Sequence, residues 1–418
     1  MSLLFLSLCI FFVVSVPIAV SLGLSSLLLL EINGMPLSAM AQKVFEGLNS
    51  FPLMALPFFI LAGNIMMNGG ISNRLINFAN ALVGGIRGGL GVVSILTSML
   101  FATMSGSSSA TTAAVGSTLI PAMEKKGYPK NFAAATCASS GELGSIIPPS
   151  IPMIIYGLVT NISIGSLFLA GIIPGIFIGL SLILTVVIIC KIRDYAPGTS
   201  IDRGIWLRNV LTAFKESLLA LLMPVIILGG IYAGIFTPTE AAAVAVIYGV
   251  IVSLFIYREM KFRDLLPILS KSAFMSSIIL LIVAFASIFS HILTIEQLPQ
   301  HLGRAVTQFT ESPMVFLLLA NLLMFFAGMF IETTGAILIL APILAPMAVQ
   351  FGIDPIHFGL IMIVNISIGM VTPPVAVNLY IACEIAQIRI EQIIRPVLVF
   401  LTVLLIDLLI ITYIPFLF

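Results

Sequence analysis

Two stretches of the sequence combine hydroxyl-bearing residues with helix breakers inside strongly apolar surroundings. The first spans 105–149, beginning SGSSSATT and ending GELGSIIPP, and the second spans 328–374, beginning GMFIETTG and ending GMVTPP. Both supply hydroxyl and backbone carbonyl oxygens that carry no formal charge. Uncharged oxygen ligands suit a weakly held monovalent cation such as sodium better than zinc or calcium. The sequence therefore predicts a cation site in each stretch.

Breaks within helices add a second kind of chemistry. The segments Gly144–Pro149 and Gly369–Pro374 interrupt otherwise apolar helical patterns. A broken helix exposes carbonyl groups at the end of its first half, which can hold a cation. It also exposes amide groups at the start of its second half, which suit an anion. Ser150 follows the first proline pair and is expected to help cap the half-helix that begins there.

The two stretches are related by a constant offset. Three landmarks, Pro121, Gly127 and Gly144-x-x-x-Pro148-Pro149, recur 225 residues later as Pro346, Gly352 and Gly369-x-x-x-Pro373-Pro374. In lipid, irregular backbone persists only where protein buries it or where it lines a cavity. Paired interruptions in corresponding halves of a chain point to a transporter binding site. The alternative for each residue taken alone is helix packing, because small residues let membrane helices approach closely.

Acidic and amide side chains lie beside these breaks. Glu142 precedes the first break and Glu332 lies at the start of the second stretch. An acid within a membrane span is a functional hypothesis by default, and a hydrogen-bonded structural acid is the alternative for both. Asn365 and Asn378 flank the second break, where they either face a bound ligand or cap backbone groups. Asp407, deep in the last apolar run, is expected to make an interhelix contact.

The composition is that of a membrane protein that crosses the bilayer many times. The 418 residues are 60% hydrophobic and only 8% charged, and apolar runs of about 20 residues recur along the chain. A net charge of +1 argues against nucleic-acid binding. The four cysteines and three histidines are isolated from one another, His-Glu-x-x-His is absent, and Ser107 has no histidine in its repeat. The sequence therefore predicts no disulfide, no structural metal and no enzyme active site.

Long apolar helices must position these residues. The stretch 89–123 has 35 residues with SGSSSATT near its middle. A straight helix of that length is about 52 Å long, against a hydrocarbon core of about 30 Å. A hairpin that folds back at Ser105–Ser109 fits better, and a second hairpin is predicted at 314–347 with its tip at 328–334. Nine spans are predicted at about 3–30, 51–67, 132–159, 166–190, a fifth ending near 236, 240–257, 273–293, 358–385 and 396–413, with amphipathic arms at 69–87 and 296–311.

Charge supports one orientation of this layout. The N-terminus, read as a retained first helix because it lacks a basic leader region, is placed inside and the C-terminus outside. Then 16 of the 18 lysines and arginines fall inside, as the positive-inside rule requires. Only Lys43 and Arg304 fall outside. The inside set is Arg74, Arg87, Lys125, Lys126, Lys130, Lys191, Arg193, Arg203, Arg208, Lys215, Arg258, Lys261, Arg263, Lys271, Arg389 and Arg395.

The consequence is an all-α, inverted-topology repeat with two re-entrant helical hairpins and two broken helices. Residues 1–190 form the first repeat, with a cytoplasm-facing hairpin at about 89–123. Residues 237–418 form the second repeat, with a periplasm-facing hairpin at about 314–347. Residues 191–236 form a basic interfacial arm around Trp206 and the linking fifth helix. The two hairpin tips and the two proline-pair breaks are predicted to meet near the midplane of the membrane.

Four motifs in this order carry a family resemblance: SGSSSATTAAVGS, GSIIPPSIPMIIYG, FTPTEAAAVAVIYG and IGMVTPPVAVNLYIA. Over essentially the whole chain the sequence resembles the large membrane subunit of tripartite ATP-independent periplasmic (TRAP) transporters. The resemblance implies a sodium-driven secondary importer of organic acids in a bacterial inner membrane, with an elevator-type fold similar to that of divalent-anion/sodium symporters. It also implies two protein partners, a periplasmic substrate-binding protein and a small four-helix membrane subunit. No such four-helix segment is fused here, so a separate chain is expected.

Carried over by motif, the resemblance implies at least two sodium sites beside a substrate site, with no organic cofactor. One sodium site would use Ser105 and Ser108 with carbonyls near Gly144, Ile147 and Pro149. The other would use Gly328, Thr333 or Thr334, Gly369 and Thr372. Candidates for binding the anionic substrate are Ser107, Ser109, Ser150, Asn365 and Asn378.

The substrate and the partners leave alternatives open. Sialic-acid and C4-dicarboxylate members share these motifs, so the resemblance does not choose between these two kinds of organic acid. A stand-alone sodium/anion symporter of the divalent-anion type would keep the same core. It would differ in needing neither a periplasmic protein nor a small subunit.

Overall fold

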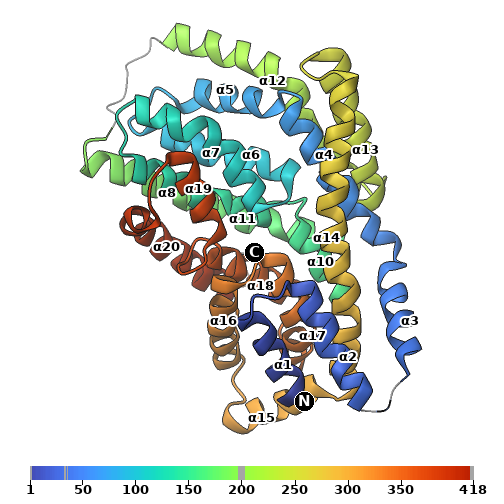
Figure 1. The fold of residues 1–418 in the computed structure, drawn as a ribbon. Helices are drawn as coiled ribbons and strands as arrows, with labels where there is room; N and C mark the ends of the chain where they lie inside the picture. The colour runs from blue at the N-terminus through green and yellow to red at the C-terminus, as the bar shows by residue number, and fades with distance from the viewer. Residues whose placement is uncertain (1, 33, 35, 196–202, 415–418) are drawn as a thin grey trace.

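The computed structural model of the protein describes residues 2–32, 34, 36–195 and 203–414. Within these residues the chain forms helices and contains no strand, which confirms the all-α prediction. The stretch 196–202, in the predicted basic arm, lies outside the described residues. Figure 1 shows the helices arranged as a tall bundle, with α12 and α5 at one end and α15 at the other.

The helices follow the chain in this order. They are α1 (Ser2–Val13), α2 (Ile18–Ile32), α3 (Leu37–Leu48), η1 (Phe51–Met54), α4 (Ala55–Asn68), α5 (Ile71–Val83), α6 (Gly89–Ser105), α7 (Ser108–Lys125), α8 (Lys130–Gly141), α9 (Leu143–Ile146), α10 (Ile151–Thr160), α11 (Ile164–Ile192), α12 (Arg203–Tyr232), α13 (Pro238–Ile251), η2 (Val252–Ile256), α14 (Phe262–Ile295), α15 (Leu298–Phe309), α16 (Pro313–Phe330), α17 (Thr333–Gln350), α18 (Pro355–Gly369), α19 (Val377–Ala386) and α20 (Ile390–Tyr413).

Both predicted hairpins are present. Helices α6 and α7 pack against each other and turn at Gly106, whose φ of +60° is the left-handed conformation that glycine adopts without a steric penalty. Helices α16 and α17 also pack together and turn at Ile331–Glu332. The outer ends of this second hairpin lie near one end of the molecule, because Tyr413 donates to the carbonyl of Met314, 3.2 Å away.

Both predicted helix breaks are present as well. The span predicted at 132–159 divides into α8, α9 and α10, and the span predicted at 358–385 divides into α18 and α19. By length and composition alone, nine segments of the described chain qualify as membrane spans, and these include both arms of the second hairpin. Those two arms pack on each other, and their tip, with Glu332 and Thr334, lines a cavity within the bundle, so we interpret them as a re-entrant hairpin and not as two crossings of the bilayer.

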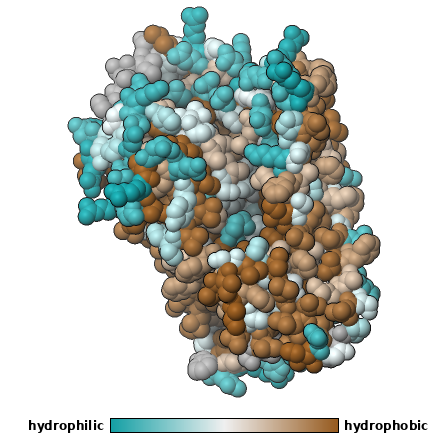
Figure 2. Space-filling model, viewed as in Figure 1, coloured by the Kyte–Doolittle hydropathy of each residue, from teal (hydrophilic) through white to brown (hydrophobic). Residues whose placement is uncertain are grey.

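Contacts between distant segments define the two ends of the bundle. At the basic end, Arg74 pairs with Glu259 at 2.6 Å and Lys130 with Glu124 at 3.1 Å. At the opposite end, the hydroxyl of Tyr156 donates to the carbonyl of Pro355, 2.9 Å away. Figure 2 shows hydrophilic residues gathered at the top and upper left of the view, and hydrophobic residues covering most of the face below them. The layout is that of a membrane protein with its basic end inside.

The two amphipathic arms are present, and the basic arm differs from its predicted form. Helix α5 lies in the predicted range 69–87 and α15 in the range 296–311. The basic arm is not separate from the fifth span, because α12 runs without interruption through both. Its first turns lie on α5, where Trp206 donates to the carbonyl of Leu82 at 3.2 Å and Phe214 packs on Phe78.

The expected first span is wrong. Instead of one helix over 3–30, α1 and α2 fold back on each other around residues 14–17. Ser15 has φ 63°, and Val16 N donates to Phe11 O at 2.9 Å. This is the Schellman helix ending, and Pro17 then prevents continuation.

Side-chain contacts along α14 show which way the N-terminal hairpin points. Phe5 packs on Phe289 with ring centroids 6.3 Å apart, and a Cβ on Gly23 would lie 2.7 Å from Phe285. Ile18, by contrast, lies beside residues 278–282 in a shared cavity. The start of α1 and the end of α2 therefore lie nearer to α15 than the turn at residues 14–17 does. Figure 1 shows the N-terminus beside α15. This places the N-terminus at the less basic end of the bundle and contradicts the prediction that it lies on the same side as most lysines and arginines.

Cysteine labelling tests this orientation. In a background lacking the four native cysteines, a Leu3→Cys variant should react with an impermeant thiol reagent added from outside, because Leu3 is 41% exposed at the less basic end. Lys126→Cys, at the mouth of the first hairpin, should react only from inside. Labelling of Leu3→Cys from inside alone would instead support the predicted single span over 3–30 with the N-terminus inside.

Candidate functional site

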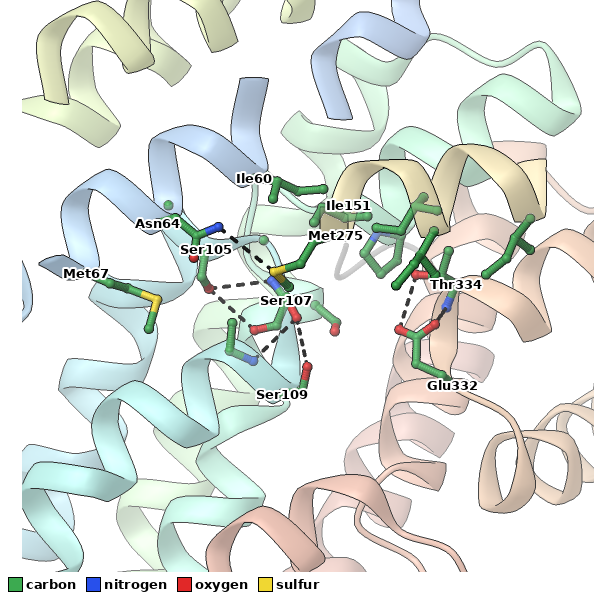
Figure 3. Close-up of a pocket in the computed structure, with 18 of the residues that line it drawn as sticks. Ile60, Asn64, Met67, Ser105, Ser107, Ser109, Ile151, Met275, Glu332 and Thr334 are labelled. Atoms are coloured by element: carbon green, nitrogen blue, oxygen red, sulfur yellow. Dashed lines mark hydrogen bonds between the residues drawn. The ribbon is translucent and has the colours of Figure 1, made fainter. Parts of the chain in front are cut away.

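The two hairpin tips and the first helix break meet at one cavity of about 350 Å³. Figure 3 shows Ser105, Ser107 and Ser109 of the first tip on one side of this cavity, and Glu332 and Thr334 of the second tip on the other. The predicted meeting of the two tips with the first break is therefore confirmed, whereas the second break, Gly369–Pro374, contributes no residue to the lining. The remaining walls come from α4 and α14, with the first residue of α2 and the start of α10. The full lining is Ile18, Ile60, Gly63, Asn64, Met67, Ser105, Gly106, Ser107, Ser109, Ala110, Ser145, Ile151, Pro152, Met275, Ile278, Ile279, Ile282, Glu332 and Thr334.

Hydrogen bonds hold the first tip in a compact shape. The hydroxyls of Ser105 and Thr111 lie 2.7 Å apart, and Thr111 also donates to the carbonyl of Ser107 at 2.9 Å. The backbone N–H of Ser108 donates to the Ser145 hydroxyl at 3.2 Å. Because Ser145 belongs to α9, this bond ties the tip directly to the first break.

Glycines allow the first tip and the first break to touch. A Cβ on Gly144 would fall inside the van der Waals contact distance of the Ser107 carbonyl and the Thr111 hydroxyl. A Cβ on Gly106 would lie 3.0 Å from the carbonyl of Pro149, and the N–H of Ile151 donates to the Gly106 carbonyl at 3.1 Å. The backbone carbonyls and hydroxyls predicted to hold a cation are thus gathered in one place.

The second tip is built on the same plan. A Cβ on Gly328 would lie 2.7 Å from the carbonyl of Ile366 and 3.2 Å from the Cα of Gly369. Thr333 is buried, and its hydroxyl has no hydrogen-bond partner. Thr372 donates to the carbonyl of Ile368 at 2.9 Å. A buried hydroxyl oxygen without a partner is an available ligand, because burying an unsatisfied polar group is unfavourable. In each break the two prolines, Pro148–Pro149 and Pro373–Pro374, are joined by a cis peptide bond.

Three helix N-termini point at the cavity. Ser107 caps α7, Ser150 caps α10 and Glu332 caps α17. The Glu332 carboxylate accepts from the backbone N–H of Thr334 at 2.9 Å and from its hydroxyl at 3.2 Å. The positive end of α17 is therefore already paired with an acid. The positive ends of α7 and α10 are capped only by neutral serines, which leaves them able to attract an anion.

The predicted site residues fall into two groups. Ser105, Ser107, Ser109 and Thr334 line the cavity, while Ser108, Gly144, Ile147, Pro149, Gly328, Thr333, Gly369 and Thr372 lie at the tips and breaks around it. The predicted substrate ligands Ser150, Asn365 and Asn378 do not line the cavity.

Their side chains bond to protein groups instead. Ser150 donates to the Ser145 carbonyl, and Asn365 donates to the side-chain oxygen of Asn321 at 2.6 Å. Asn378 donates to Glu142 at 2.5 Å. For Asn365 and Asn378, bonding to protein groups therefore replaces the expected role of facing a ligand.

The residues of α2, α4 and α14 that line the cavity were not identified from the sequence. Asn64 of α4 faces the cavity and donates to the hydroxyl of Ser272 at 2.9 Å, which ties α4 to α14. Met275 of α14 and Ile18 of α2 complete this wall. An asparagine inside an apolar span was the available signal for Asn64, whereas Met275 and Ile18 resemble every other apolar residue of a span.

Opposed hairpins, two broken helices and a central cavity lined by hydroxyl groups and one acid define the class of protein. This is a polytopic membrane transporter with an inverted repeat. The chain belongs to the family described as "Tripartite ATP-independent periplasmic transporter, DctM component", whose match covers residues 5–417. The suspected TRAP resemblance is therefore confirmed, and the chain is a transporter permease component.

Similar proteins cover nearly the whole chain. It is 45% identical to the C4-dicarboxylate TRAP transporter large permease protein DctM of Pseudomonas aeruginosa, over 94% of this chain and 92% of that one. It is 44% identical to the isethionate TRAP transporter permease protein DctMQ of Oleidesulfovibrio alaskensis, over 97% of this chain and 64% of that one. It is 40% identical to the sialic acid TRAP transporter large permease protein SiaM of Vibrio cholerae, over 92% of this chain and 89% of that one.

A solved structure shares the fold. The crystal structure of the YdaH transporter of Alcanivorax borkumensis superposes with a TM-score of 0.68 over 91% of this chain and 89% of that one. The sequence identity is 16%, so this likeness concerns the fold alone.

A Gly144→Ala substitution tests the contact between the first tip and the first break. The added methyl group collides with the Ser107 carbonyl, and such overpacking costs about 1–3 kcal/mol. We expect a lower unfolding temperature in detergent and loss of uptake. Gly229→Ala on α12 is the matched control, because a Cβ there meets nothing within 4 Å. Equal stability and uptake in both variants would show that the tip does not depend on this contact.

Proposed function

We propose that this chain is the membrane-translocating subunit of a sodium-coupled importer of a small organic acid, in a bacterial inner membrane. The observation that carries the proposal is the charge of the cavity. Its lining includes the acid Glu332 and no lysine, arginine or histidine among the described residues. An anion enters such a site only with positive charge from another source, and bound sodium ions together with two helix N-termini supply it.

The residues at the tips and breaks fit two sodium ions. In the first site, the hydroxyls of Ser105 and Ser108 would bind with carbonyls of the first break, from Gly144 to Pro149. In the second, the unpartnered hydroxyl of Thr333 supports a ligand role, alongside carbonyl groups at Gly328, Gly369 and Thr372. All are uncharged oxygens, which suit a weakly held monovalent cation such as sodium. Each ion would fix one hairpin tip against one broken helix.

The substrate site would lie between these two sodium sites. Ser107 and Ser109 would donate hydroxyl hydrogen bonds to the organic acid, and the N-termini of α7 and α10 would stabilise its carboxylate. The apolar wall from α4 and α14 would cover the rest of the molecule. Relatives are named for C4-dicarboxylate, isethionate and sialic acid, so a panel of these acids is the natural substrate set.

The arrangement also supports an elevator motion. The two hairpins and the broken helices form one group, in which each tip contacts a break through backbone at glycines. Helices α4 and α14, joined by the bond between Asn64 and Ser272, form a second group. In this proposal the first group moves across the membrane as a body, while the second stays in place.

Membership of the family implies a tripartite system. We propose that a periplasmic binding protein delivers the substrate and that a small four-helix membrane subunit completes the complex. The relative named DctMQ is longer than its match to this chain, which spans 64% of it.

Sodium coupling is tested with Thr333→Val, which removes the unpartnered hydroxyl and keeps the shape of the side chain. Losing one uncharged ligand is expected to cost about 1–2 kcal/mol, a five- to thirtyfold rise in the sodium concentration for half-maximal uptake. Excess sodium should restore transport. Thr402→Val, whose hydroxyl bonds to its own helix on an exposed face of α20, is the control. A proton gradient that drives full wild-type uptake without sodium would reject the coupling.

Dependence on partners is tested by reconstitution. Liposomes that contain this chain and its small subunit should take up substrate only when the periplasmic binding protein is added, because the family works as a tripartite system. The small subunit should also co-purify with this chain. Full uptake by this chain alone would favour the stand-alone sodium/anion symporter, the second candidate function, which keeps the same core.

A further inference from the structure

The part of the cavity wall that comes from α2, α4 and α14 carries one polar side chain among the described residues, that of Asn64. The other residues that these helices contribute are isoleucine, methionine and glycine. Asn64 is 7% exposed, and a polar group that is buried to this extent is unfavourable unless it forms hydrogen bonds. The partners of its amide group therefore decide what this part of the wall can bind.

Helix α14 holds the amide group of Asn64 in one orientation. The hydroxyl of Ser272 donates to the carbonyl of Ile268 at 2.8 Å. A serine hydroxyl has one hydrogen, so the Ser272 oxygen can only accept from Asn64. The amide nitrogen Nδ2 therefore lies toward Ser272, at 2.9 Å, and it is also 4.0 Å from the sulfur of Met275. This leaves the amide oxygen, Oδ1, as the end of the group that is not bonded to α14.

Within the described residues, no hydrogen bond reaches Oδ1 of Asn64. The bond from Asn68, at 2.8 Å, goes to the backbone carbonyl of Asn64 instead. A carboxamide oxygen accepts hydrogen bonds and cannot donate them. Because Asn64 lines the cavity, a bound molecule that carries a hydrogen-bond donor can satisfy this oxygen.

Asn64 lies near the first hairpin tip. A Cβ on the preceding residue, Gly63, would lie 3.5 Å from the Cα of Ser105, and Figure 3 shows Asn64 on the same side of the cavity as Ser105 and Ser107. Ser107 caps α7, one of the two helix N-termini proposed to stabilise the substrate carboxylate. A donor that reaches Asn64 from a bound acid must therefore lie close to the carboxylate group.

We propose that Asn64 is a specificity-determining residue, whose Oδ1 accepts a hydrogen bond from a hydroxyl group of the substrate. This inference rests on the proposed function and narrows its substrate to a 2- or 3-hydroxy acid. A keto group in the same place would set one acceptor against another, and an unsubstituted carbon would leave Oδ1 without a partner. Both arrangements are unfavourable in a buried site. A site that hydrogen-bonds a substrate hydroxyl discriminates against analogues that lack it.

The experiment measures binding to the purified complex at saturating sodium, with three sets of acids. Each set has a hydroxy, a keto and an unsubstituted member: lactate, pyruvate and propionate; 3-hydroxybutyrate, acetoacetate and butyrate; malate, oxaloacetate and succinate. In at least one set, wild type should bind the hydroxy acid about two- to tenfold more tightly than the unsubstituted acid, as one neutral hydrogen bond provides. The keto acid should bind no more tightly than the unsubstituted acid.

Two variants separate the proposed role of Oδ1 from the bond that joins α4 to α14. Asn64→Leu, which is similar in shape, should weaken binding of the hydroxy acid to the level of the unsubstituted acid and leave the unsubstituted acid unaffected. Ser272→Ala removes the same interhelix bond but keeps Oδ1. Its Asn64 amide is free to turn, so the keto acid should gain affinity relative to the hydroxy acid. Asn68→Leu is the matched control and should keep the wild-type preference, because it makes the same change one turn along α4, outside the cavity lining.

Wild-type binding that favours the hydroxy acid in no set would overturn the proposal. So would an equal loss of affinity for every member of a set in both Asn64→Leu and Ser272→Ala, because it would mean that Asn64 only joins the two helices. Failure of the proposed function gives a different result. Uptake by the complete system in liposomes would then show no dependence on sodium, whichever acid the purified complex prefers.

Discussion

The fold depends on one constraint, which is that every backbone polar group in the membrane interior needs a partner. Two hairpin tips and two helix breaks place irregular backbone in the middle of this bundle. The chain satisfies this constraint by packing each hairpin tip against a helix break, and glycine residues allow the close backbone contact. Gly144 lies on the Ser107 carbonyl, and Gly328 lies on Gly369. Carbonyls and hydroxyls that cannot bond within a helix are thereby concentrated around one cavity, where a cation and an anion can use them.

Charge is managed in different ways at the three buried or cavity-lining acids. Glu332 caps α17 and accepts hydrogen bonds from the backbone N–H and the hydroxyl of Thr334. Asp407 accepts from Ser181 between α20 and α11, as the sequence predicted for an interhelix contact. Glu142 has one amide donor and nothing else. The cavity lining combines hydroxyl groups with the acid Glu332 and has no lysine, arginine or histidine among the described residues. In the proposed function, the sodium ions that enter with the substrate balance its charge.

The sequence predicts the core of this architecture because the signals there are strong. The constant offset between the two motifs, their glycines and the distribution of lysines and arginines lead to the hairpins, the breaks and the opposed halves. The N-terminal hairpin escaped prediction for two physical reasons. The first 30 residues contain no charged side chain, so the positive-inside rule says nothing about them. The left-handed residue that ends α1 is Ser15, whereas glycine is the usual signal for such an ending.

The roles of individual polar residues were harder to predict than their positions. Asn378 and Glu142 come from different repeats, and only the folded chain shows that they touch. Asn365 likewise finds its partner on α16. Pattern analysis places such residues at a break but cannot show whether a neighbouring helix or a ligand satisfies them. The wall formed by α4 and α14 has no motif at all, because apolar residues that face a cavity look like those that face lipid.

The central claim is that sodium ions at the tips and breaks build the anion site between them. Reciprocal binding measurements on the purified complex test it most directly. Substrate affinity is measured at several sodium concentrations, and sodium affinity at several substrate concentrations. Linkage requires that each ligand change the affinity of the other by the same factor, and the account predicts that both affinities rise. Substrate binding that is equally tight without sodium would contradict it.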